Sequence, residues 1–310
     1  FERVPERPRR ECKETDTHFI FESEKLSVKI NKNTGFVDSV IKNGNEFVNE
    51  GAFALEVWND NSDPWYMEET EWLEKIGEFE LLNDSDAQKF CNTREAIKGV
   101  HIIEYGDVRT VFEAVFGYNK SNAVVKYIIS NDGSFKTDIR INWCEKEKLI
   151  KLKVPSSFGA TQCIGEHPYG REVMKNALEE NVSQKYVAIC SDKKAILAVN
   201  NGVYGSSFDD EMGELHITLM RSPSYCAHPV DTRVVMPQDR AMPYIEQGER
   251  DFSFEFCFGE KAEILHKASR TAQHFNVSPM VLSFYPTGVG EIPLSPIKIT
   301  DNDIINITAF

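Results

Sequence analysis

The chain is 310 residues long and has 35 lysines and arginines against 49 aspartates and glutamates, which gives a formal net charge of −14 at pH 7. This balance argues against a surface that neutralises nucleic-acid phosphates or anionic lipids. Hydrophobic residues make up 41% of the chain, and no apolar run approaches the roughly 20 residues that a membrane-spanning helix needs. We therefore expect no nucleic-acid partner and no membrane span, and a neutral substrate or partner fits the charge better.

The first strand signals come early in the chain and are separated by turn residues. Leu26–Ile30 and Phe36–Ile41 flank the turn sequence Asn33-Thr34-Gly35, which predicts an antiparallel hairpin. Asn43-Gly44 and Asn131-Asp132-Gly133 follow two further strand-like runs. Neighbouring strands are therefore expected to be mostly antiparallel.

Apolar and polar residues alternate through the middle of the chain, which is typical of half-buried strands. In Phe135–Trp143 the odd-numbered residues form the buried face and the even-numbered residues the polar face. Leu149–Val154 repeats the pattern, with Lys151 and Lys153 opposite three aliphatic residues. Asp251–Phe258 places four phenylalanines on one face. These runs predict a mainly β protein.

Two helices are predicted among the strands. Leu265, Ala268, Ala272 and Phe275 fall on one face of a helix from about Glu260 to Phe275. A second, shorter helix is predicted around Glu68–Ile76. The proline-containing loop at 286–296 is the best candidate for a domain boundary. We expect a sandwich domain over residues 1–285 and the truncated start of a further β region over residues 286–310.

Both ends of the sequence look cut, because Phe1 stands in place of an initiating Met and a strand-like run reaches the last residue, Phe310. The seven cysteines are scattered and include no C-x-x-C motif. Cys144, Cys190 and Cys257 fall in strand-like runs, so we expect mainly reduced core thiols. This favours a cytoplasmic location, although a trimmed N-terminus would hide a signal peptide.

No local motif for catalysis or metal binding is complete. The sequence has no H-E-x-x-H, no G-x-S-x-G and no P-loop. Cys226 and His228 could face a metal together with the distant His216 or His167, but a loop cysteine near a histidine explains them as well. Adjacent carboxylates such as Glu68-Glu69 are expected by chance in so acidic a chain. We predict no catalytic residue, no metal ligand and no cofactor in this chain.

Three segments have an unusual mixture of residue types for a loop, and the mixture in the first suits a sugar. The segment 58–67 places Asp63 beside Trp65; aromatic faces stack on sugar rings and carboxylates bind hydroxyls, and a turn at Asp63-Pro64 is the alternative. Arg221 ends a strand-like run before a Ser-Pro turn, where it can bind a hydroxyl or a carboxylate, or remain a surface charge. Tyr204 lies in a glycine-flanked turn, where packing over the turn is the alternative.

Taken together and in this order, several segments resemble the C-terminal region of family 38 glycoside hydrolases, the α-mannosidases. Two motifs are fairly specific to that family, N-W-x-E-x-x-x-L-x-K-L-K-x-P between residues 142 and 155 and L-M-R-S-P between residues 219 and 223. The segments that carry the resemblance are Phe19–Asp38, Asn59–Met67, Ile103–Gly106, Ile139–Pro155, Lys185–Gly205, Leu215–Pro223 and Ala272–Pro279.

The resemblance implies a mutarotase-like β-supersandwich followed by a smaller β domain that is present only in part. It implies that zinc, the nucleophilic aspartate and the acid/base carboxylate belong to an upstream α/β barrel and the region after it. The chain would then be the non-catalytic part of a retaining, zinc-dependent enzyme that hydrolyses terminal α-mannosides. Its partners would be a mannose-containing oligosaccharide and its own barrel, and the oligomeric state is left open.

The resemblance also bears on the candidate residues. Arg221 resembles a strand-end arginine of the family that reaches toward the substrate. Asp63 and Trp65 lie in the segment that approaches the active site from the sandwich side. Together with Tyr204, these residues are the predicted substrate contacts. The alternatives are a stand-alone carbohydrate-binding or mutarotase-like module and an adhesive or structural β-sandwich.

Overall fold

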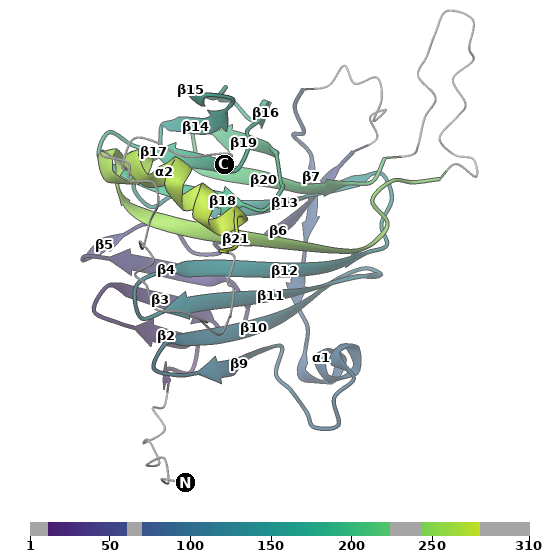
Figure 1. The fold of residues 1–310 in the computed structure, drawn as a ribbon. Coiled ribbons are helices and arrows are strands. Elements are labelled where there is room, and N and C mark those ends of the chain that lie inside the picture. Colours follow the sequence, from purple (N-terminus) through teal and green to yellow (C-terminus); the bar gives the residue numbers. More distant parts are fainter. Residues whose placement is uncertain (1–11, 61–69, 224–242, 280–310) are drawn as a thin grey trace, which may run out of the picture.

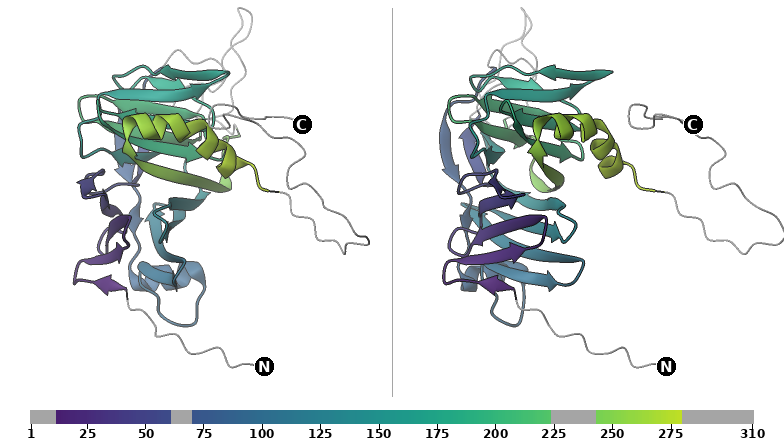
Figure 2. Two further views of the ribbon diagram at one scale, coloured as in Figure 1. Left: turned by 60° about the vertical axis from the view of Figure 1, so that its left-hand side comes forward. Right: turned by 90° about the vertical axis from the view of Figure 1, so that its left-hand side faces the viewer.

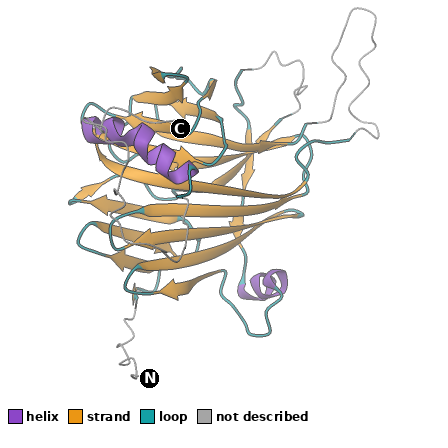
Figure 3. Ribbon diagram, viewed as in Figure 1, coloured by secondary structure: helices purple, strands orange, loops and turns teal. Residues whose placement is uncertain are grey.

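A computed structural model describes residues 12–60, 70–223 and 243–279, and most of these residues form β-strands (Figures 1 and 3). Every strand pair among them is antiparallel, and the strands make three sheets of five, ten and six strands. The predicted mainly β class is confirmed. No helix in these residues is both long enough and apolar enough to cross a membrane.

The five-stranded sheet contains the first predicted hairpin. Its central pair is joined through Asn33-Thr34-Gly35, as the turn sequence predicts, and Gly35 adopts a φ of 74° that favours glycine. The strands, in sheet order, are β1 Lys13–Glu14, β2 His18–Glu22, β3 Leu26–Asn31, β4 Val37–Lys42 and β5 Asn45–Glu46.

The ten-stranded sheet contains two of the three alternating runs. Phe135–Trp143 is a strand whose odd-numbered residues are all buried, and the four phenylalanines of the run 251–258 point to the same face, so both predictions are confirmed. The strands, in sheet order, are β15 Gly170–Val173, β14 Gln162–His167, β17 Tyr186–Cys190, β18 Lys194–Asn200, β21 Gly248–Glu260, β12 Phe135–Trp143, β11 Ser121–Ser130, β10 Arg109–Tyr118 and β8 Glu80–Leu81, with β9 Val100–Tyr105 also paired to β10.

The six-stranded sheet contains the third alternating run, in β13. The strand is confirmed, but the expectation of a half-buried strand is wrong, because Lys151 on its polar side is only 1% exposed. The strands, in sheet order, are β16 Glu180–Val182, β19 Gly205–Asp209, β20 Glu214–Arg221, β13 Lys148–Pro155, β6 Leu55–Asn59 and β7 Lys75–Glu78.

One continuous core joins the three sheets. In Figure 2 the five-stranded sheet, in purple, faces part of the ten-stranded sheet, and stacked rings such as Phe36 on Phe116 fill the space between them. The inner face of the six-stranded sheet adds residues such as Leu55 and Ile150 to the same core. This arrangement of facing antiparallel sheets confirms the predicted supersandwich.

The helix predicted from the 3.6-residue periodicity is confirmed as α2, Lys261–Asn276. Its buried face covers the outer side of β17 and β18, where Leu265, Ala268 and Ala272 pack in a second, smaller core (Figure 1). The helix therefore covers the outer face of the ten-stranded sheet over β17, β18 and part of β21.

The second helix, predicted at Glu68–Ile76, is wrong for the residues that the structure describes. Glu71 forms a β-bridge with Glu179, and strand β7 begins at Lys75 and pairs with β6. Trp72 lies between these two pairings and packs on the sheet, so tertiary contacts override the local pattern. A short helix that was not predicted, α1, spans Asp84–Cys91.

The described cysteines are all free thiols, but they are not all in the core. Cys190 is buried in β17, Cys257 is half-buried in β21, and Cys144 is exposed. The expected core position is wrong for Cys144, because the strand ends at Trp143 and the exposed Cys144 lies just beyond it. The proposed boundary at 286 and the region 286–310 lie outside the described residues.

Candidate functional site

Strands β6, β13 and β20 lie side by side in the middle of the six-stranded sheet, and both of their faces are buried. The inner face contributes aliphatic residues such as Leu55, Ile150 and Ile217 to the main core. The outer face instead carries mainly charged and aromatic side chains, which pack together and are shielded from water. The buried residues of this outer layer on the three strands are Glu56, Trp58, Leu149, Lys151 and His216.

An ion pair links two strand ends at one edge of this sheet. Strands β6 and β20 are both antiparallel to β13, so they end at the same edge. Asp60 directly follows β6, and Arg221 is the last residue of β20. The guanidinium donates through Nε to Oδ2 of Asp60 at 2.7 Å and through Nη2 to Oδ1 at 2.9 Å. Such a two-point contact fixes the plane of the guanidinium as well as its position.

Trp72 holds the same pair from a third direction. Its indole N–H donates to Oδ1 of Asp60 at 3.2 Å, and the guanidinium carbon of Arg221 lies 4.6 Å from the centre of one of its rings. A cation over an indole face is stabilised by the ring quadrupole. Arg221 is thus held at one edge by a carboxylate and on one face by an aromatic ring.

The stack continues inward to a buried lysine. The ammonium of Lys151 lies 5.8 Å from a ring centre of Trp72 and 5.8 Å from one of Trp58. It donates to Oε2 of Glu180 at 2.6 Å and to the hydroxyl of Ser207 at 2.7 Å. Burial lowers the pKa of Lys151, and the charge of Glu180 opposes that shift. Cations and indoles therefore alternate from Arg221 to Trp58.

A second carboxylate anchors the other side of this layer. Nδ1 of His216 lies 3.1 Å from Oε2 of Glu56, and Nζ of Lys75 lies 2.7 Å from Oε1. Burial alone would raise the pKa of Glu56, but the hydrogen bonds and charges of His216 and Lys75 outweigh it and lower the pKa to about 2. Glu56 is therefore held as a carboxylate at neutral pH.

These contacts suit a site that holds the cationic side chain of Arg221 in a fixed position, rather than a site that performs catalysis alone. The three buried or half-buried carboxylates Asp60, Glu180 and Glu56 each contact a cationic group, so each is already committed to an ion pair. The described part of the chain contains no group of three or more His, Cys, Asp or Glu residues that could hold a metal ion. The guanidinium of Arg221 can donate to sugar hydroxyls from a fixed position.

The structure places two of the four predicted substrate contacts. Arg221 lies at the sheet edge just described, with its side chain 20% exposed. Tyr204 is 56% exposed and directly precedes β19, whose first residue, Gly205, pairs with Thr218 near the same end of β20. Asp63 and Trp65 lie outside the described residues.

The two histidines named as alternative partners of Cys226 and His228 lie on different sheets. His216 is in the six-stranded sheet, where it binds Glu56, whereas His167 ends β14 of the ten-stranded sheet. Cys226 and His228 lie outside the described residues.

Three residues of the site were missed in the sequence. Asp60 lies inside the aromatic and acidic segment 58–67, and its position directly after a strand was an available signal. Lys151 was assigned to a solvent face, and Trp72 to a helix. Nothing local marks Lys151, because its partners Glu180 and Ser207 are 29 and 56 residues away in the sequence. Trp72 lies only 12 residues from Asp60, and it was missed because its segment was predicted to be helical.

Comparison with known families settles the relationship of this chain. The model of the family described as "Glycosyl hydrolases family 38 C-terminal domain" matches residues 21–238, which is more than half of the chain. The chain belongs to this family. The resemblance noted in the sequence is thereby confirmed, and Arg221, Asp60, Trp72 and Lys151 all fall within the matched family 38 region.

Solved structures agree with the family at the level of fold. A protein of glycosyl hydrolase family 38 from Enterococcus faecalis superposes with a TM-score of 0.61 at 14% identity, covering 82% of this chain and 31% of that one. An α-mannosidase from Enterococcus faecalis superposes with a TM-score of 0.60 at 14% identity, covering 82% and 30%. The family 38 domain seen here thus spans less than a third of these proteins. No protein with a curated description matches the sequence.

Proposed function

We propose that this chain is the C-terminal β part of a retaining, zinc-dependent α-mannosidase and that it is inactive by itself. The observation that carries the proposal is the family 38 match, together with a guanidinium held rigidly at a sheet edge. In the whole protein this edge would lie at the rim of the active site. Arg221 would bind hydroxyls of a terminal mannose, with Tyr204 and the segment of Asp63 and Trp65 as further contacts.

The catalytic parts are assigned to the rest of the protein. The described residues do not fit a zinc site, because they bring no three ligands together and Asp60, Glu180 and Glu56 are engaged in ion pairs. As the family resemblance implies, zinc, the nucleophile and the acid/base carboxylate would come from an upstream barrel and the region after it, and that barrel would be the chain's first partner. The free thiols support a cytoplasmic location as part of the same proposal.

The experiment compares the 310-residue chain with the longer protein that contains it. We expect the chain alone to release no p-nitrophenol from p-nitrophenyl α-D-mannoside and to retain no zinc after gel filtration. The longer protein should release p-nitrophenol and retain zinc, and its activity should disappear on chelation of zinc. Turnover by the chain alone, or tight zinc binding by it, would contradict the assignment.

A mutarotase-like activity receives no support from the described geometry. Such an enzyme needs an acid and a base, usually a histidine and a glutamate, on either side of the sugar. Here Nε2 of His101 lies 3.4 Å from Oε1 of Glu113, so the two side chains bind each other. Unchanged rates of mutarotation of fresh α-D-glucose and α-D-galactose in the presence of the chain would agree with this reading.

A further inference from the structure

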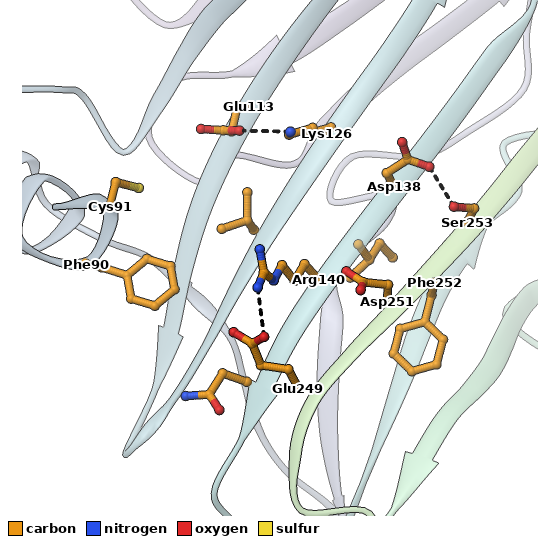
Figure 4. Close-up of a pocket in the computed structure, with 13 residues that line it drawn as sticks. Phe90, Cys91, Glu113, Lys126, Asp138, Arg140, Glu249, Asp251, Phe252 and Ser253 are labelled. Carbon is orange, nitrogen blue, oxygen red and sulfur yellow. Dashed lines mark hydrogen bonds and ion pairs between the residues drawn. The ribbon is translucent and has the colours of Figure 1, made fainter. Parts of the chain in front are cut away.

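The outer face of the ten-stranded sheet is divided between two different surfaces. Helix α2 covers the half over β17 and β18, whereas none of the described helices lies over β12 and β11 (Figure 1). On that open half, between α1 and β21, lies a groove of about 680 Å3 (Figure 4). This volume is within the range of ligand sites, roughly 300–1,000 Å3.

The floor of the groove is built in cross-strand rows of alternating charge. Glu113 on β10, Lys126 on β11, Asp138 on β12 and Ser253 on β21 lie directly opposite one another across successive strand pairs. Nζ of Lys126 lies 3.7 Å from Oε2 of Glu113, and the hydroxyl of Ser253 donates to Asp138 at 2.8 Å. Donors and acceptors therefore alternate across the groove, as Figure 4 shows.

The next rows add a guanidinium and an amide. Arg140 lies opposite Asp251, and its Nη2 donates to Oε2 of Glu249 at 2.7 Å. Both partners of this pair have side chains that are 60% exposed, so a ligand can reach them. Asn142 lies opposite Glu249 and also lines the groove. Phe90 on α1, which is 39% exposed, lies at the side of the groove (Figure 4).

We propose that this groove binds a neutral saccharide. Its four carboxylates and two cations give it a net negative charge, which disfavours anionic ligands. Glu113, Asp138 and Glu249 contact a lysine, a serine and an arginine in turn, so the floor is not a bare acidic cluster that would favour a polyamine. Hydroxyl groups can both accept from Arg140 and Lys126 and donate to the carboxylates, and an aromatic ring suits the C–H face of a sugar.

This site goes beyond the proposed function and does not depend on it. It lies on the outer face of the ten-stranded sheet, whereas Arg221 lies in the six-stranded sheet. The chain alone could therefore bind sugar here whether or not the longer protein is a mannosidase.

The test is calorimetric titration of the 310-residue chain with α-linked mannotriose, maltotriose and, as a charged comparison, spermidine. We expect saturable binding of at least one trisaccharide. Arg140→Ala should lower the association constant for that trisaccharide about tenfold, because a hydrogen bond from a charged donor is lost. Phe90→Ala should weaken it severalfold. Arg109→Ala is the matched control, since Arg109 forms a similarly exposed ion pair with Glu104, at 2.8 Å, outside the groove lining.

Each outcome either supports or contradicts saccharide binding in the groove. Weaker binding in the Arg140 and Phe90 variants with wild-type binding in the Arg109 variant supports it. Absence of binding to both trisaccharides, binding to spermidine alone, or equal effects of the Arg140 and Arg109 substitutions overturns it. Circular dichroism confirms that the compared variants are folded.

Discussion

The carboxylate of Asp60 is fully buried, and its oxygens accept hydrogen bonds from Arg221 and Trp72. We expect Asp60→Asn to lower the free energy of unfolding by about 2–3 kcal/mol, because a half-buried guanidinium loses its counter-charge. Urea unfolding monitored by tryptophan fluorescence measures the change. Glu74→Gln serves as the control, because it also removes one negative charge near this strand end, but from an exposed side chain that keeps an oxygen to accept from Asn59. An unchanged midpoint for Asp60→Asn would show that the ion pair is not a stabilising contact.

Glu56 predicts an acid-sensitive component of stability. Its pKa in the folded chain is about 2, below its ordinary value of 4.5. Its contribution is therefore fully present above about pH 4.5 and is lost as the pH falls from there toward 2, by an amount on the order of 3 kcal/mol. Urea unfolding at pH 6 and pH 3.5 should show a smaller loss of stability on acidification for Glu56→Gln than for the wild type. Glu263→Gln, at an exposed position on α2, should lose as much stability between pH 6 and pH 3.5 as the wild type. Identical losses of stability in all three proteins would refute the assignment.

At the scale of single elements, α1 depends on its N-cap. The side chain of Asn83 accepts a hydrogen bond from the backbone N–H of Asp86 at 3.0 Å. Asn83→Ala should destabilise the helix by about 1 kcal/mol, whereas Asn83→Ser retains a capping oxygen and should stay close to the wild type. Amide hydrogen exchange across residues 84–91 measures the local effect. Equal protection in the Ala and Ser variants would count against the cap.

The elements differ in how far they can be predicted from sequence. Strands such as β12 and β21 follow directly from period-two alternation, since one face of each is buried in the core. The capping sequence at Asn83 was an available signal for α1. The segment around Trp72 could not be placed in this way, because its conformation depends on packing against Trp58 and Leu149. The local pattern of apolar residues predicts a strand well where one face of the sheet is buried and the other is not. It fails where contacts with other strands fix the conformation of a connecting segment.

The same distinction holds for the candidate site. Arg221 could be selected because it ends a strand in a family-specific motif. Its partner Asp60, however, is 161 residues away in the sequence. Lys151 stands at a position where the alternating pattern predicts exposure to solvent, yet it is almost fully buried. Which polar residues meet is set by the order β20–β13–β6 in the sheet. That order depends on long-range pairing, which no local pattern encodes.

At the scale of the whole molecule, the sandwich carries two outward-facing polar surfaces on different sheets. The one at Arg221 is a compact stack of indoles with the half-buried Arg221 and the buried Lys151, and the one at Arg140 is an open groove with exposed ion pairs. Burial fixes side chains more strongly than exposed pairing does. The first surface is therefore suited to hold one group in a defined position, and the second to bind a ligand along several contacts.

This difference leads to a kinetic prediction for the longer protein that contains the chain. Arg221→Lys keeps the positive charge beside Asp60 but removes the two-point contact and the planar stack on Trp72. If Arg221 binds a terminal mannose equally in the ground state and the transition state, KM for p-nitrophenyl α-D-mannoside should rise about tenfold while kcat stays close to the wild-type value. Zinc content should not change, which separates lost substrate binding from a damaged metal site.

Arg109→Lys in the same protein provides the matched control, because it makes the same substitution in an ion pair on the other sheet, outside both polar surfaces. Its KM should remain at the wild-type value for this monosaccharide substrate. Equal kinetics for Arg221→Lys and the wild type would remove Arg221 from the substrate contacts. Equal increases in KM for both substitutions would instead indicate a general structural effect of replacing an ion-paired arginine, because only Arg221 is fixed at the edge proposed to face the active site.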